Sequence, residues 1–148
     1  MAKAKSKVNM PPDKLKKCRA IIHTAAMAAG AAGAIPIPVV DALPIGAAQL
    51  TMIVGLGKVF DLTINRGVAK SIAGIGTATV VGRTVASSLS KLVPIIGPVF
   101  SAATAIAITE GLGWLVADDF YRMSIGKEPE DIIDAADSIT GLHDRIKR

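Results

Sequence analysis

Long uncharged runs of alanine, glycine and aliphatic residues, interrupted by proline, dominate this chain. They cover residues 20–40, 43–57, 71–82 and 92–109. Runs of this length, with little alternation between polar and apolar residues, favour helices over strands. Alanine and glycine allow helices to approach closely but contribute less hydrophobic burial than leucine or phenylalanine. The sequence therefore predicts an all-α fold of Ala/Gly-rich helical hairpins, and its 148 residues fit a single domain.

Proline residues mark where the predicted apolar helices begin and end. We expect four such helices, at residues 13–34, 38–62 and 68–92 and, after Pro94 and Pro98, up to residue 123. The two proline-rich reversals resemble each other, which leaves open a duplication of one hairpin.

The C-terminal residues 127–147 differ from the rest of the chain, because they are acidic at the start and basic at the end, as suits a helix dipole. One apolar stripe follows this predicted amphipathic helix and forms a candidate docking face for a partner: Ile132, Ala136, Ile139, Leu142 and Ile146. The expected organisation is a basic flexible tail (1–12), an apolar hairpin domain (13–126) and a charged C-terminal helix (127–148).

Positive charge is concentrated at the N-terminus. Residues 1–19 carry seven lysine or arginine side chains against Asp13, within a chain of net charge +5. Such a segment attracts anionic lipid headgroups, by roughly 1 kcal/mol for each basic residue near the surface. A merely solvated tail is the alternative. Nucleic acid is not an expected partner, because this segment has no aromatic residue for stacking on bases.

Three charged residues lie within the apolar stretches and bear on whether the hairpins enter a membrane. Arg83 would cost roughly 2.5 to 3.5 kcal/mol at the centre of a bilayer, so its helix could insert only beside neighbours that shelter the charge. Asp41 and Glu110 are the candidate partners for such buried charge. The alternative places all three on solvated helix faces.

Three aromatic residues cluster near the end of the fourth predicted helix: Trp114, Phe120 and Tyr121. In membrane hairpins they would form an interfacial belt, with the basic connections on the same side of the bilayer. A small aromatic core in a soluble bundle would explain them equally well.

No catalytic, cofactor or metal site is expected. The chain has two histidines and one cysteine, Cys18, and contains no HExxH or CxxC pattern. The glycines of residues 74–82 lack the dinucleotide-binding spacing, and residues 55–60 have valine where a phosphate loop needs serine or threonine. Asp118 and Asp119 are adjacent and so point to different sides of a helix, which makes them a poor acid–base pair.

Two segments resemble the YcjF-like family of GTPase-associated bacterial helical membrane domains, whose function is uncharacterised. The first segment carries Pro36, Pro38, Asp41, Gln49, Met52 and Gly57, and the second carries Pro94, Gly97, Gly113 and Phe120. The resemblance covers roughly residues 20 to 121. It implies a helical fold and a connection to a GTPase, which would have to be a separate protein because this chain has no GTPase domain.

Together these features predict a non-enzymatic, membrane-associated helical module that acts through protein–protein contacts, with a GTPase or another cytoplasmic protein as partner. Its expected location is the bacterial inner membrane or the cytoplasmic face of that membrane. Two alternatives remain open. One is a soluble scaffold that forms a homo-oligomer through its Ala/Gly faces in the cytoplasm, and the other is a channel-like or membrane-permeabilising protein.

Overall fold

The computed structural model describes residue 6 and residues 8–33, 43–88 and 102–133, with side-chain surroundings at 6, 8–31, 46–80 and 105–133. All regular structure in this part of the chain is α-helical, in agreement with the predicted all-α class. The helices are α1 (Pro12–Gly33), α2 (Leu43–Val59), α3 (Arg66–Ser88) and α4 (Ala102–Ser124). The proline-rich segments and most of the predicted C-terminal amphipathic helix lie outside the described residues.

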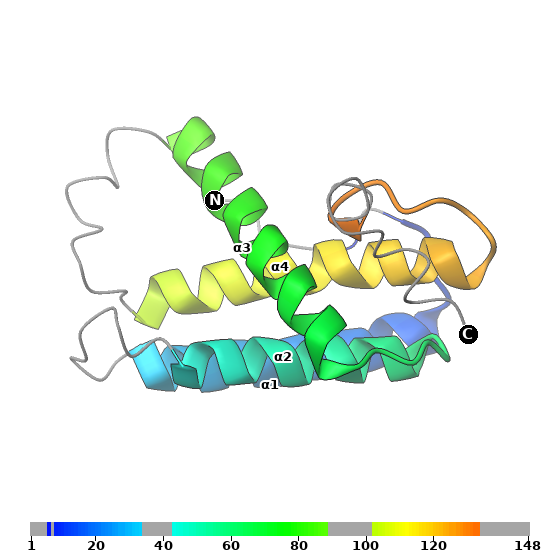
Figure 1. The fold of residues 1–148 in the computed structure, drawn as a ribbon, viewed down its shortest axis with the longest axis horizontal. Coiled ribbons are helices and arrows are strands. Elements are labelled where there is room, and N and C mark those ends of the chain that lie inside the picture. Colours follow the sequence, from blue (N-terminus) through cyan, green and yellow to red (C-terminus); the bar gives the residue numbers. More distant parts are fainter. Residues whose placement is uncertain (1–5, 7, 34–42, 89–101, 134–148) are drawn as a thin grey trace.

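Helices α1 and α2 form an antiparallel pair, along which α4 runs while α3 crosses obliquely (Figure 1). Lys14 Nζ donates a hydrogen bond of 2.7 Å to the carbonyl oxygen of Val59, which fixes the start of α1 beside the end of α2. Pro12 opens α1 and Asp13 lies in its first turn, as the sequence predicted from the open N–H groups and dipole of a helix start.

The connection between α2 and α3 is set by two local motifs. The N–H of Leu62 binds the carbonyl of Gly57 at 2.8 Å and that of Asp61 binds Lys58 at 3.2 Å, which is a Schellman termination with Asp61 at φ 58°. Asn65 then caps α3, because its Oδ1 accepts the N–H of Val68 at 2.8 Å. The predicted start of α3 at residue 68 is therefore two residues late.

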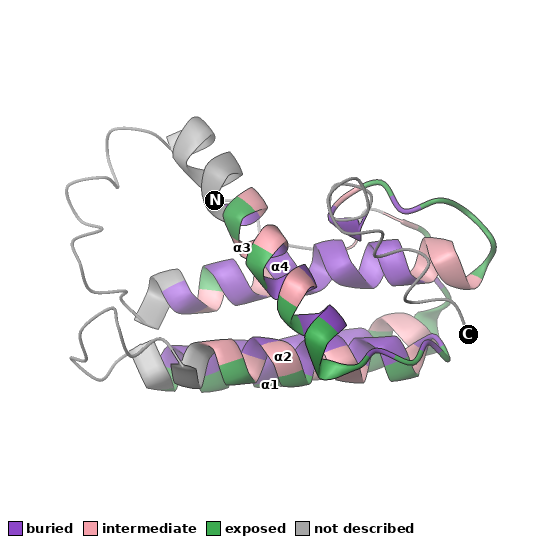
Figure 2. Ribbon diagram, in the orientation of Figure 1, coloured by how far each residue is buried: buried purple, intermediate pink, exposed green. Residues whose placement is uncertain are grey.

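Helix α4 is the central helix of the fold. Every residue from Leu112 to Phe120 is buried, although this stretch includes two aspartates (Figure 2). A helix buried on all sides must have neighbours around it, and α1, α2 and α3 all contact α4. Because this part of α4 is shielded from water, its polar side chains need hydrogen-bond partners from the protein itself.

Glycines allow the close approach of these helices that the composition predicted. A Cβ atom on Gly113 would lie 2.7 Å from Ile22 Cγ1 and 2.9 Å from Met52 Sδ, so an alanine there would force side chains of α1 and α2 to shift. A Cβ on Gly57 would lie 2.5 Å from Ile64 Cγ1. Gly113 thus allows close contact between helices, whereas the neighbours of Gly57 are Ile64 and Leu62 in the connection after α2, and Gly97 lies outside the described residues.

Candidate functional site

The most constrained polar group of the described structure is the carboxylate of Asp119. This side chain is fully buried in α4 and accepts four successive backbone N–H groups. Oδ1 binds those of Glu130 and Asp131 at 3.0 Å, and Oδ2 binds those of Ile132 and Ile133 at 2.7 and 2.9 Å. The carboxylate thus holds the chain after α4 in the way an anion is held by a run of free amides. We call this arrangement the Asp119 cap.

Arg122, one turn later on α4, completes the Asp119 cap. Its Nη1 lies 3.0 Å from Asp119 Oδ1 and 2.9 Å from Asp131 Oδ2, and its Nη2 lies 3.7 Å from Glu130 Oε2. Burial acts to lower the pKa of Arg122. The hydrogen bond and charge of Asp131, together with the charges of Asp119 and Glu130, outweigh that effect and raise the pKa above its ordinary value. The guanidinium therefore stays charged and neutralises the buried carboxylate.

The segment held by the Asp119 cap is docked through apolar side chains. Pro129, Ile132 and Ile133 are buried, and the side chain of Ile132 fills the space above Gly76 of α3. Gly126, at φ 78°, reverses the chain after α4, where the N–H of Lys127 binds the carbonyl of Arg122 at 2.8 Å. The turn and the cap together fold residues 127–133 back onto α3 and α4.

This docking corrects one part of the predicted docking face. Ile132 is fully buried within its own chain, so it is not available to a partner in this conformation. The cause is Gly76, whose missing side chain leaves room for the isoleucine. The remaining positions of the stripe, Ala136, Ile139, Leu142 and Ile146, lie outside the described residues.

Asp118, the neighbour of Asp119, faces a different element, as expected for adjacent helix positions. The Ser6 hydroxyl donates a 2.7 Å hydrogen bond to Asp118 Oδ1, which ties the N-terminal segment to α4. The pKa of the buried Cys18 thiol is raised to about 11, first by loss of solvation and then by the charge of Asp118, against which Lys14 acts. Cys18 is thus a neutral core residue with low reactivity.

Gln49 forms a buried polar link between three helices. Its Nε2 lies 3.5 Å from Thr109 Oγ1 on α4, and its Oε1 accepts the Thr77 hydroxyl of α3 at 3.4 Å. The described partners of Gln49 are therefore two threonines, one on α3 and one on α4. Threonine hydroxyls satisfy the amide without the cost of a buried charge.

Of the three charged residues within the apolar stretches, Asp41, Arg83 and Glu110, the structure describes the surroundings of Glu110. Glu110 is partly buried on α4, and its Oε1 lies 2.5 Å from Nδ1 of the exposed His23 on α1. Asp41 and the side chain of Arg83 lie outside the described residues, so the proposed pairing among these charges stays a prediction.

The aromatic cluster belongs to the interior. Trp114 and Phe120 are buried in the helical core, and Tyr121 packs partly buried against Phe60 with ring centroids 6.0 Å apart. Trp114 and Phe120 therefore lie where the aromatic core considered from the sequence would place them, and the interfacial belt stays a prediction. The described residues of the family-like motif are all buried as well: Gln49, Met52, Gly57, Gly113 and Phe120.

Two further findings concern the described part of the chain. No helix in it has the length and apolar character needed to cross a bilayer. Its histidine, cysteine and acidic side chains form no group of three that could hold a metal ion. Among the described residues, the Asp119 cap, the Ser6–Asp118 bond and the Gln49 link are polar contacts that each join one part of the fold to another.

Sequence reasoning missed the Asp119 cap, although a signal was present. Two adjacent aspartates in an otherwise apolar helix need buried partners, and a run with two acidic residues before two isoleucines follows about ten positions later. The sequence does not show that these two segments meet, because their contact depends on the turn at Gly126.

These features define a small helical domain in which two buried carboxylates of α4 hold other parts of the chain. Asp118 holds the N-terminal segment, and Asp119 holds the segment that follows α4. Among proteins of known name, it is similar to "Magnetosome membrane protein 22" of Magnetospirillum gryphiswaldense. The two are 37% identical over 94 residues, which cover 55% of this chain and 48% of that protein. The chain thus spans about half the length of this relative. No protein-family profile matches the chain, and no solved structure matches it.

Proposed function

We propose that this chain is a membrane-associated helical module that works through contacts with lipid and protein rather than through catalysis. The observation that carries the proposal is the similarity to a protein named for the magnetosome membrane, at 37% identity over 94 residues. The bacterial inner membrane, or its cytoplasmic face, is the location we propose.

The distribution of apolar and charged segments along the fold supports this proposal. The described ends of α1, α2, α3 and α4 that flank residues 34–42 and 89–101 lie toward one end of the molecule, whereas the connection at 60–65 and the charged connection at 125–133 lie toward the other (Figure 1). The sequences of residues 34–42 and 89–101 are rich in proline and aliphatic residues. The proline-rich apolar segments and the charged 125–133 connection are thereby attached to opposite ends of the described helices.

Fractionation of cells that express the tagged chain tests membrane association. Membranes are washed with high salt, then with carbonate at high pH, and finally with detergent, because these steps separate headgroup attraction from hydrocarbon burial. Recovery in the membrane fraction before the washes supports the proposal. Recovery in the soluble fraction from the start would contradict it.

The protein partner is the second part of the proposal. The resemblance to the YcjF-like family makes a GTPase the first candidate, and the positions of the apolar stripe that follow Ile133 in the sequence make residues 134–148 the proposed docking segment. Because Pro129, Ile132 and Ile133 belong to the core, a truncation must begin after Ile133 to leave the Asp119 cap intact.

Truncation after Ile133 is expected to abolish capture of a GTPase partner while leaving membrane recovery unchanged. The matched control is Ile125→Ser, which changes an exposed apolar side chain outside the stripe and should leave capture intact. Equal capture by the truncated and full chains would contradict the assignment of the docking segment.

A further inference from the structure

The side of the α1–α2 pair that faces away from α4 is a continuous exposed surface. On α1 its exposed positions recur at steps of three and four, which places them on one face of the helix. They are Lys16, Lys17, Ala20, Thr24, Met27, Ala28 and Ala31 on α1, with Ala47, Thr51 and Lys58 on α2. We call this surface the outer α1–α2 face. The hydrogen bond from Lys14 to Val59 places Lys58 beside the start of α1.

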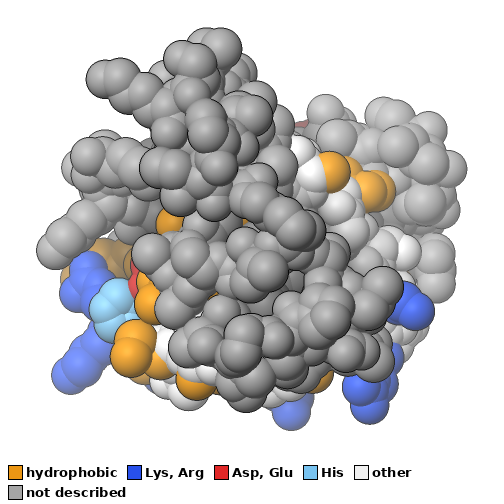
Figure 3. Space-filling view, turned by 90° about the vertical axis from the view of Figure 1, so that its left-hand side faces the viewer, with side chains coloured by type: hydrophobic (Ala, Val, Ile, Leu, Met, Phe, Trp, Pro, Cys, Tyr) orange, Lys and Arg blue, Asp and Glu red, His pale blue; other side chains and the backbone are white. Residues whose placement is uncertain are grey.

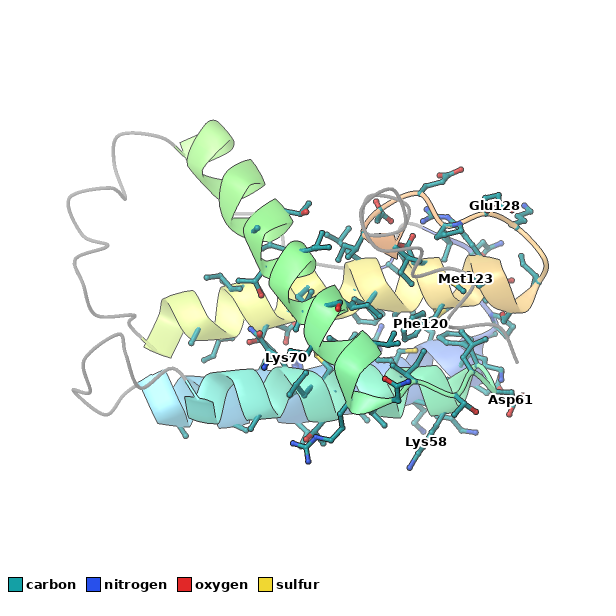
Figure 4. The ribbon with its side chains drawn as sticks, in the orientation of Figure 1. Lys58, Asp61, Lys70, Phe120, Met123 and Glu128 are labelled. Carbon is teal, nitrogen blue, oxygen red and sulfur yellow. The ribbon has the colours of Figure 1, made fainter. Side chains whose placement is uncertain are left out.

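One half of this surface is strongly basic. The exposed basic side chains on and around it form a rim composed of Lys16, Lys17, Arg19, Lys58, Arg66 and Lys70. Among the residues of described exposure in the first three helices and the 60–65 connection, the exposed acids are Asp13 and Asp61. Figure 3 shows blue side chains along the lower edge of the molecule, and Figure 4 shows Lys58 projecting below the ribbon. The rim thus carries a net positive charge.

The other half of the outer α1–α2 face has no lysine or arginine and is weakly apolar. From Ala20 to Ala31 the exposed positions of α1 are small or hydroxyl-bearing, apart from Met27 and from His23, whose Nδ1 contacts Glu110 of α4. Met27 is 66% exposed and is one of two large hydrophobic side chains exposed in the described structure. Methionine is flexible and apolar, so it can enter the boundary between headgroups and acyl chains without a fixed pocket.

We propose that the outer α1–α2 face is a membrane-docking surface, on which the basic rim binds anionic phospholipid headgroups while Met27 enters the interface beside them. Charge complementarity favours phosphate groups as the ligand. A protruding methionine on a bed of small residues favours lipid over nucleic acid, since base recognition uses aromatic stacking or side chains that read base edges. This inference rests on the proposed membrane association and specifies the face and the lipid class.

The size of the effect follows from the contribution of each basic residue near an anionic surface. Loss of one lysine of the rim lowers vesicle affinity by about fivefold, and loss of three lowers it on the order of 100-fold. Salt should weaken binding steeply, because the rim is exposed and its charges are screened within a Debye length of about 10 Å at 0.1 M salt.

Vesicle co-sedimentation of the full chain tests the inference. The probes are phosphatidylcholine vesicles with and without phosphatidylglycerol, and duplex DNA serves as a competing polyanion. The variants are Lys58→Gln and the triple exchange Lys16→Gln/Lys17→Gln/Lys58→Gln, with Lys127→Gln as the control at an exposed lysine outside the rim. Met27→Ser is paired with Ile125→Ser, the other exposed large hydrophobic position. Circular dichroism confirms that each variant remains folded.

The expected result is binding to anionic but not neutral vesicles, weakened about fivefold by Lys58→Gln, more by the triple exchange, and by less than twofold with Lys127→Gln. Met27→Ser should weaken binding more than Ile125→Ser. A triple variant that binds like the parent chain would overturn this inference and leave membrane association standing. A parent chain that binds no vesicle would overturn both. Selective binding of DNA, lost in the triple variant, would assign the face to nucleic acid and overturn the lipid proposal.

Discussion

Replacement of Asp119 by asparagine is expected to detach the segment that follows α4. The exchange keeps the size of the side chain but replaces one carboxylate oxygen with an NH₂ group. The remaining oxygen can still accept the N–H groups of Glu130 and Asp131, which lie 3.0 Å from Oδ1. The NH₂ group would face the N–H groups of Ile132 and Ile133, donors that Oδ2 accepts in the parent chain.

The magnitude follows from the groups left without partners. Two buried backbone N–H groups lose their acceptor, and each such loss costs about 1 to 3 kcal/mol. Arg122 also loses the negative charge beside its Nη1, although Asp131 still holds it at 2.9 Å. Asp119→Asn should therefore lower the free energy of unfolding by about 2 to 6 kcal/mol. If residues 127–133 detach before the helices unfold, the loss of stability appears first as faster amide hydrogen exchange in that segment.

Urea unfolding followed by circular dichroism measures the global effect, and amide hydrogen exchange at residues 130–133 measures the local one. The control is Asp61→Asn, the same chemical exchange at an exposed position where φ is 58° and asparagine is well tolerated. Faster exchange at Ile132 and Ile133 in the Asp119 variant alone is the predicted outcome. Unchanged exchange and unchanged urea stability would refute the reasoning, because they would mean that the Asp119 cap contributes nothing to docking.

Three further predictions concern the core and the turns. Gly113→Ala should lower the free energy of unfolding by about 1 to 3 kcal/mol, since its Cβ would lie 2.7 Å from a side-chain carbon of Ile22. Gly74 has open space around it, so Gly74→Ala should instead raise the free energy of unfolding by about 0.5 to 1 kcal/mol, measured by thermal unfolding. Asp61→Gly should raise stability by about 0.5 to 1 kcal/mol, because glycine adopts φ 58° without strain, and a lower melting temperature would contradict this. The pKa of Cys18 is raised from 9.0 to about 11 in the folded chain, so the stability linked to it is present below pH 9.0 and is lost as the pH rises toward 11. Stability curves of the parent chain and Cys18→Ala should diverge in that range, and parallel curves would contradict the assignment.

The sequence predicted the helices well because their signals are local. Pro12 and Asp13 mark the start of α1 through groups within the first turn. The uncharged runs indicate helices without fixing their ends, since α3 begins at Arg66 and α4 extends to Ser124. Close helix contact at Gly113 was also predictable, since glycine in an apolar helix is costly unless a neighbour needs the space. The two-residue error at the start of α3 is local too, because that start depends on Asn65 acting as the cap of the helix.

The polar interior could not be predicted in the same way. Whether Asp119 faces water or four amides depends on how the chain turns at Gly126, and the Ser6–Asp118 bond joins residues 112 positions apart. Ile132 illustrates the same difficulty: its place in an apolar stripe is visible in the sequence, but its burial depends on the space left by Gly76 in another helix. Periodicity identifies an apolar face and cannot say which surface covers it.

The central claim of membrane docking is tested most directly by a spin label at position 27 in a Cys18→Ala, Met27→Cys chain, with a label at Ile125→Cys as reference. Accessibility of each label to oxygen and to a water-soluble relaxation agent is measured with and without phosphatidylglycerol vesicles. The account predicts that vesicles move the label at position 27 into the oxygen-rich boundary of the acyl chains and leave the label at position 125 in water. A label at position 27 that stays as water-accessible with vesicles as without them would contradict the account.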